Sequence, residues 1–182
     1  MIAQTKNNKD IFIRQISGED FHALNIYLNE LSDDTKKRFG PHYYDIGSLN
    51  KFYSTPGHIG IIAEEPEHRK IVAYSIIKMG YVVHDKPRLE SLGLHASNEA
   101  VCTFAPSVAD EWQSVGIGDL MLSYIHSILI QQDINHIILW GGVQADNQKA
   151  INYYLKNGFK ILGEFEYHGR NYDMVFKFDL EE

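Results

Sequence analysis

The sequence predicts an α/β protein in which helices cover both faces of a mixed β-sheet. Strand-like and helix-like segments alternate along the chain in the order β-α-α-β-β-β-α-β-α-β-β, which is typical of such a sheet. The 182 residues, 44% of them hydrophobic, are enough to bury one sizeable core. No repeat, low-complexity tract or shift in composition marks a boundary, so we expect a single domain over residues 1–182.

In the first half of the chain, the elements are indicated by periodicity and by helix-ending residues. Apolar and polar residues alternate in IFIRQI, the pattern of a half-buried strand. Ser17 and Asp20 offer caps to the helix that follows, and Gly40-Pro41 ends a second, shorter helix. The predicted elements are a strand at 11–16, helices at 21–31 and 33–39, and hairpin strands at 58–63 and 70–78 joined by the turn EEPEHR.

The second half begins with a less regular stretch that we expect to be an extended loop. The later segment 117–131 spaces its apolar residues as an amphipathic helix does. A short helix is stopped by Asn157-Gly158, with Gly158 as a left-handed cap. The predicted elements are a loop at 79–98, a strand at 100–108, a helix at 117–131, a buried strand at 136–143, a helix at 147–156, and strands at 159–166 and 172–178.

Composition bounds the classes of function. A formal charge of −7 argues against broad nucleic-acid binding, which normally uses a basic face. The single cysteine, Cys102, excludes an intrachain disulfide, and its apolar neighbours indicate a buried small side chain. The nine histidines form no metal-binding spacing, so no metal is expected. Without an apolar signal core or a run of ~18 apolar residues, the expectation is a cytoplasmic protein with no membrane partner.

The segment WQSVGIG, residues 112–118, lies between a strand and a helix. Glycines at such a junction allow the backbone to approach a ligand closely, and the first N–H groups of a helix favour an anion. A plain loop with a tight helix entry is the alternative interpretation. A Rossmann loop requires a third glycine where Met121 stands, and a P-loop requires G-K-[ST], which is absent.

Two motifs together resemble those of the GNAT acetyltransferase superfamily. Gln113-x-x-Gly116-x-Gly118 resembles the R/Q-x-x-G-x-G/A signature, which wraps the pyrophosphate of coenzyme A. NQKAINYYLKNGF, residues 147–159, resembles the second signature, N-x-x-A-x-x-x-Y-x-x-x-G-F, and LSDDTKKRF at 31–39 resembles the first-helix segment of one subgroup. The resemblance spans residues 11–178 and implies a mostly antiparallel sheet in which two parallel strands splay apart.

The resemblance also implies a site. Acetyl-CoA would be the cosubstrate, and the Tyr154 hydroxyl would protonate the departing thiolate. The interpretation in which Tyr154 is a core residue, packed with Ala150 and Ile151, stays open. Val108 is implied as a backbone partner of pantetheine. The implied coenzyme-binding residues are Val108, Gln113, Ser114, Val115, Gly116, Ile117, Gly118 and Asn147.

One departure from the family concerns the general base. Many relatives carry a glutamate early in the strand at 100–108, where this chain has Cys102 and Thr103 and no carboxylate. Pro106 also lacks the N–H that some relatives use. The sequence leaves open whether the substitute is Glu99, Asp110, His95 or a water relay. Deprotonating a lysine amine costs about 4 kcal/mol at neutral pH, so a missing base favours an amine of lower pKa.

The resemblance therefore implies an N-acetyltransferase that transfers acetyl directly from acetyl-CoA to a primary amine. A small-molecule acceptor, such as an amino sugar or a polyamine, is favoured over a protein. The alternatives are acetylation of protein lysines or N-termini, and a non-catalytic acyl-CoA sensor, since a fold does not dictate a function. The oligomeric state stays open, with a homodimer allowed.

Overall fold

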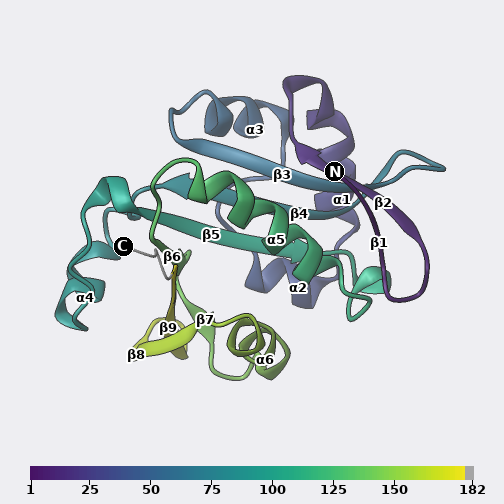
Figure 1. The fold of residues 1–182 in the computed structure, drawn as a ribbon. Coiled ribbons are helices and arrows are strands. Elements are labelled where there is room, and N and C mark those ends of the chain that lie inside the picture. Colours follow the sequence, from purple (N-terminus) through teal and green to yellow (C-terminus); the bar gives the residue numbers. More distant parts are fainter. Residues whose placement is uncertain (179–182) are drawn as a thin grey trace. The chain divides into compact units, whose positions relative to one another are not determined.

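The computed structural model describes residues 1–178, and its fold is shown in Figure 1. The chain divides into two compact units. The first unit comprises residues 1–77 and 105–128, and the second comprises residues 78–104 and the chain from Leu129 onward. Strands β4 (Lys70–Met79) and β5 (Val101–Val108) continue from one unit into the other. The expected single domain stays a prediction.

The first unit consists of antiparallel strands with helices on both faces. The hydrogen-bonded order is β1-β2-β3-β4-β5. In Figure 1, α5 passes in front of β4 and β5, whereas α1 and α2 lie behind these strands. The other elements of this unit are β1 (Ile2–Gln4), β2 (Asp10–Gln15), η1 (Gly18–Asp20), α1 (Phe21–Glu30), α2 (Asp33–Arg38), α3 (Ile46–Tyr53), β3 (His58–Glu65), η3 (Asp110–Trp112) and most of α5 (Ile117–Ile130).

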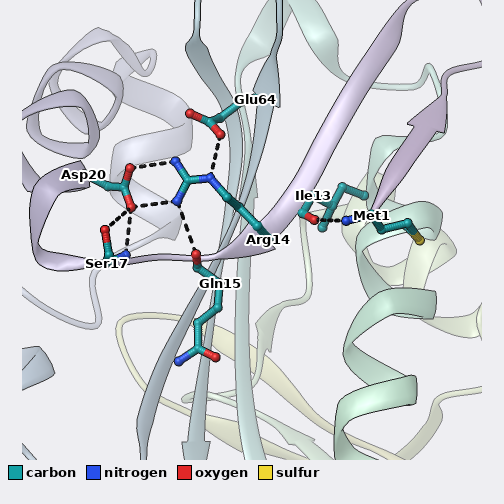
Figure 2. A network of polar contacts seen from close by, with 7 residues as sticks. All are labelled: Met1, Ile13, Arg14, Gln15, Ser17, Asp20 and Glu64. Atoms are coloured by element: carbon teal, nitrogen blue, oxygen red, sulfur yellow. Dashed lines mark hydrogen bonds and ion pairs between the residues drawn. The ribbon is translucent and has the colours of Figure 1, made fainter.

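An arginine anchors the end of β2 in this unit. Figure 2 shows the Arg14 guanidinium between Asp20, at 2.7 Å, and Glu64, at 2.8 Å. The hydrogen bonds from Arg14, together with the Ser17 N–H at 2.7 Å, lower the pKa of Asp20 to about 2 although partial burial opposes this. The Met1 ammonium donates to the Ile13 carbonyl at 2.6 Å, so β1 is also held against β2.

The second unit contains the parallel pair of strands. Residues of β5 pair in parallel with β6 (His136–Leu139), and the register runs from Val101↔His136 to Phe104↔Leu139. The order continues β6-β9-β7, with antiparallel pairs, and β8 pairs with β9. The other elements are β7 (Val143–Gln144), β8 (Lys160–Glu166), β9 (Arg170–Lys177), α4 (Lys86–Ser91), η2 (Asn98–Ala100) and α6 (Gln148–Lys156).

A partly buried arginine joins α4 to β9 in this unit. Arg88 donates to both carboxylate oxygens of Asp173, at 2.7 and 3.0 Å, and to Asp85 at 2.8 Å. Asp173 is only 1% exposed, and the Arg88 guanidinium also lies 3.7 Å from the centre of the Phe165 ring. Since a buried carboxylate is costly without a partner, Arg88 fixes the position of α4.

The mixed, mostly antiparallel arrangement with a parallel pair is confirmed, but two local predictions were wrong and two elements were missed. The stretch 79–98 contains α4, which has a proline in its first turn, a common helix start. Helix α3, capped by Asp45, and the edge strand β1 were missed. The predicted strand at 136–143 breaks because Gly141 and Gly142 adopt φ values of 66° and 72°, so β6 and β7 are separate.

Candidate functional site

The glycine-containing loop lies in the first unit, between β5 and α5. Ser114 has φ 65° and Gly116 has φ 90°, both in the left-handed region, and α5 begins at Ile117. The bond from the Leu120 N–H to the Gly116 carbonyl, at 3.2 Å, joins the loop to the first turn of the helix. Gly118 is the second helical residue. The segment 112–118, which the sequence singled out, therefore contains the N-terminus of α5, with its backbone N–H donors and the positive end of the helix dipole.

Gln113, the first residue of the signature, ties the loop back to the strand. Its side-chain amide donates to the Val108 carbonyl at 3.1 Å and to Asp110 at 3.4 Å. Val108 is half-buried at the end of β5, four residues beyond Phe104, the last residue of the parallel register. Gln113 therefore stabilises the conformation of the loop through these two hydrogen bonds.

Asp110 anchors helix α2 beside this loop. Its carboxylate accepts hydrogen bonds from the Ser32 N–H at 3.0 Å, the Ser32 hydroxyl at 2.9 Å and the Thr35 hydroxyl at 3.0 Å. Partial burial favours the neutral form, but these bonds hold the pKa of Asp110 below its ordinary value. Asp110 is thus a structural carboxylate, which makes it a poor substitute for the missing base. The resemblance at 31–39 coincides with this helix, whose N-cap Ser32 is hydrogen-bonded to Asp110.

Sequence reasoning missed Lys6, which comes from the turn between β1 and β2. The Lys6 N–H donates to the Val115 carbonyl at 2.9 Å, and a Cβ placed on Gly116 would lie 3.3 Å from the Lys6 Cγ. Nothing local in the sequence marks this contact, since more than one hundred residues separate the two segments.

In the second unit, the residues of the second signature are found at the two ends of α6. Asn147 is the N-cap, and its side-chain oxygen accepts from the Ala150 N–H at 3.2 Å. At the other end, the Phe159 N–H donates to the Tyr154 carbonyl at 3.0 Å, and the Gly158 N–H donates to Leu155 at 3.1 Å. With Gly158 at φ 84°, this is a Schellman cap, and the predicted left-handed glycine is confirmed.

Tyr154 is a buried tyrosine, 7% exposed, on α6. Its ring centre lies 5.2 Å from that of Tyr153 and 5.3 Å from that of Phe159, so aromatic neighbours form much of its packing. Burial raises the pKa of the Tyr154 hydroxyl, which therefore stays protonated at neutral pH. Within residues 1–178 this hydroxyl has no hydrogen-bond partner. The Tyr154 hydroxyl is therefore available to donate a hydrogen bond to a ligand.

The other base candidates differ in their surroundings. Glu99 and His95 are exposed residues of the second unit. The sequence did not single out His42, in the first unit. Its Nδ1 donates to the Tyr43 carbonyl and its Nε2 is hydrogen-bonded to the Tyr74 hydroxyl, both at 2.8 Å, and burial lowers its pKa. Cys102 is fully buried and burial raises the pKa of its thiol, so it is the predicted packing residue rather than a nucleophile.

The residues that could hold a metal within the described chain are Glu65, Glu67 and His68, on the turn between β3 and β4. Glu65 already accepts from the backbone N–H groups of Glu67 and His68, both at 3.1 Å, as a turn carboxylate does. Within residues 1–178, no helix has both the length and the apolar character needed to cross a membrane.

Several solved structures share this fold. The GNAT domain of S. lividans PAT superposes with a TM-score of 0.78 at 18% identity, covering 98% of this chain and 96% of that one. A Salmonella typhimurium protein described as an acetyltransferase, solved with its cofactor acetyl-CoA, gives 0.67 at 16% identity, with coverages of 94% and 96%. An aminoglycoside acetyltransferase solved with coenzyme A gives 0.67 at 15% identity, with coverages of 92% and 94%. The fold is therefore that of the GNAT proteins.

The sequence itself places the chain in this class. A model of the acetyltransferase (GNAT) family matches residues 24–159, a segment that includes the glycine loop and α6. No curated protein sequence matches the chain. The protein belongs to the GNAT acetyltransferase family.

Proposed function

We propose that the protein is an acetyl-CoA-dependent N-acetyltransferase that acetylates a primary amine of a small molecule. The observation that carries the proposal is the loop 113–118, where Gly116 at φ 90° leads directly into α5. A helix N-terminus preceded by left-handed residues forms an anion site from backbone groups alone. Relatives of the same fold, solved with acetyl-CoA or coenzyme A, support the choice of the anion.

The proposed roles follow the family signatures. The loop holds the pyrophosphate of the coenzyme, the Val108 backbone pairs with pantetheine, and Asn147 contacts the coenzyme arm. The amine nitrogen attacks the thioester carbonyl, a tetrahedral intermediate forms, and its collapse breaks the carbon–sulfur bond. The departing thiolate takes the proton of the Tyr154 hydroxyl, and the amine loses its proton to water. The Tyr154 phenolate is then reprotonated from solvent.

The chemistry of the missing base supports a small-molecule acceptor. Strand β5 carries no carboxylate, and Asp110 is engaged in hydrogen bonds with Ser32, the N-cap of α2. An amine that is partly neutral at pH 7, as on an amino sugar, needs less help to lose its proton than a lysine side chain does. Protein amines are the competing acceptors, and a coenzyme sensor without turnover is the competing function.

The test is a thiol-release assay with purified protein, acetyl-CoA and four classes of amine. The amines are an amino sugar, a polyamine, a lysine-containing peptide and a peptide with a free N-terminus, with an amine-free sample to measure hydrolysis. Since Cys102 is buried, the folded protein adds little background thiol. Fastest release with the amino sugar or the polyamine supports the proposal. Release only with peptides moves the acceptor to proteins, and coenzyme binding without any release supports the sensor.

A further inference from the structure

The turn between β1 and β2 packs on the glycine loop, and both belong to the first unit. The Lys6 N–H donates to the Val115 carbonyl at 2.9 Å. The Lys6 side chain then runs along Gly116, because a Cβ placed there would lie 3.3 Å from Cγ, 3.6 Å from Cδ and 3.4 Å from Cε. Three successive methylene groups at this distance mean that the side chain follows the loop, which brings the ammonium, one bond further on, close to it.

The turn is ordered by its own hydrogen bonds. Thr5 is 4% exposed, and its N–H donates to the Lys9 carbonyl at 2.9 Å, while its hydroxyl accepts from the Lys9 N–H at 3.0 Å. Asn8, at φ 60°, donates to the Thr5 carbonyl at 3.0 Å. The turn therefore sets the backbone position of Lys6, so that the side chain is the part of the residue that a ligand has to order.

The two lysines of this turn differ in their partners. The Lys9 ammonium lies 4.5 Å from the centre of the Trp112 ring, where a cation–π interaction holds it. Lys6 is exposed, and within residues 1–178 its ammonium forms no ion pair or hydrogen bond. An uncompensated cation fixed on a loop with left-handed backbone at Ser114 and Gly116 suits an anionic ligand.

The loop itself supplies no positive side chain. Between residues 108 and 119 the sequence contains Asp110, Glu111 and Asp119 and neither lysine nor arginine. A pyrophosphate bound there would meet backbone dipoles together with nearby carboxylates, in a protein of formal charge −7. A positive side chain for the anion therefore has to come from another segment. Lys70 lies 3.7 Å from Glu111 and Lys9 lies over Trp112, whereas Lys6 lies along Gly116.

We infer that Lys6 is a coenzyme-binding residue whose ammonium pairs with the pyrophosphate held by the loop. The inference rests on the proposed function, which assigns that loop to coenzyme A. Lys6 also gives a second reason for glycine at position 116: any side chain there would adopt a strained φ and press on the lysine methylenes.

The experiment measures, by calorimetry at low salt, the affinity of the protein for coenzyme A and for 3′-dephospho-coenzyme A. The second ligand keeps the pyrophosphate and lacks the 3′-phosphate. Lys6→Met should lower the affinity for both ligands by a similar factor, about tenfold, because a hydrogen bond between charged groups is lost. Lys6→Arg should keep most of the affinity, and the loss in Lys6→Met should shrink as salt is added. Lys51→Met, which removes one exposed charge from α3 in the same unit, is the matched control and should bind as the wild type does.

Three results would overturn the inference while leaving the proposed function intact. The first is that Lys6→Met binds both ligands as tightly as the wild type does. The second is that Lys6→Arg and Lys6→Met lose the same amount of affinity. The third is that Lys6→Met loses affinity for coenzyme A but not for 3′-dephospho-coenzyme A. The second result would assign Lys6 to packing, and the third would assign it to the 3′-phosphate. Failure of the wild type to bind either ligand would instead remove the proposed function.

Discussion

The glycine loop and helix α6 both match a family signature, but their residues have different structural explanations. In α6, Asn147 caps the first turn, and Tyr154, Gly158 and Phe159 form the Schellman cap at the other end. Folding alone explains the asparagine at 147, the glycine at 158 and the phenylalanine at 159. In the loop, Ser114 and Gly116 adopt left-handed φ values before the helix. Residues other than glycine adopt this backbone conformation at a cost of about 1–2 kcal/mol, so the cost falls on Ser114.

The difference shows that two equally good signature matches can give unequal support for a functional role. Strained backbone that no helix end requires is typical of ligand-binding segments, so the loop supports a functional interpretation. The residues of α6 would be selected for stability even in a protein without activity. Tyr154 is the exception, because its ring serves the fold while its hydroxyl has no partner within residues 1–178. Four predictions test this contrast, beginning with the largest expected effect.

Tyr154→Phe should lower turnover about a hundredfold while leaving stability and acetyl-CoA affinity nearly unchanged. A positioned general acid contributes ~10²–10⁴ in rate, and the low pKa of a thiol places the loss at the lower end. Phenylalanine keeps the packing against Tyr153 and Phe159, and the hydroxyl has no hydrogen bond to lose within the described chain. Turnover is measured by thiol release and stability by thermal unfolding, with Tyr153→Phe as the control. A lower melting temperature with turnover preserved would make Tyr154 a core residue only.

Gly158→Val should destabilise the protein by about 2 kcal/mol and leave coenzyme affinity unchanged. The substitution forces a β-branched residue to φ 84°, and its Cβ would lie 3.2 Å from the Phe176 ring. Denaturant unfolding measures the loss, and Gly158→Ala should show a smaller one. A change in coenzyme affinity without a change in stability would contradict the view that this glycine serves the fold.

Gly116→Val should weaken coenzyme A binding at least tenfold, equivalent to about 1.4 kcal/mol, because the side chain crowds both the ligand and Lys6. The strain at φ 90° also costs stability, so calorimetry is done well below the melting temperature. Gly116→Ala, which adds a single methyl group, is the matched smaller change. Unchanged affinity in the valine variant would favour a plain turn over a phosphate site.

Asn147→Ala should cost about 1 kcal/mol of stability, the usual effect of losing an N-cap. Asn147→Ser keeps a capping oxygen and should restore the stability to within a few tenths of a kcal/mol. If the amide also contacts the coenzyme arm, both variants should bind acetyl-CoA more weakly than the wild type. Normal affinity in the serine variant would limit Asn147 to its capping role.

The sequence predicted most elements because their signals are local. The alternation in 11–16, the helical spacing in 117–131 and the Asn157-Gly158 stop each appear within a few residues, and each element was found. The prediction failed where a local signal was weak or misinterpreted. Pro87 lies in the first turn of α4, inside the stretch 79–98 that is predicted to be a loop. Gly141 and Gly142 separate β6 from β7, inside the stretch 136–143 that is predicted to be one strand.

The family, the fold class and the residues to be tested could all be predicted from the sequence, because the signatures are contiguous and local backbone geometry restricts their residue types. The surroundings of those residues follow from tertiary packing. Lys6 lies along Gly116, Asp110 accepts hydrogen bonds from Ser32 at the start of α2, and the Tyr154 hydroxyl has no partner within residues 1–178. Such contacts join segments far apart in the chain, and no local pattern encodes them, since they depend on how β1, β2 and the helices pack.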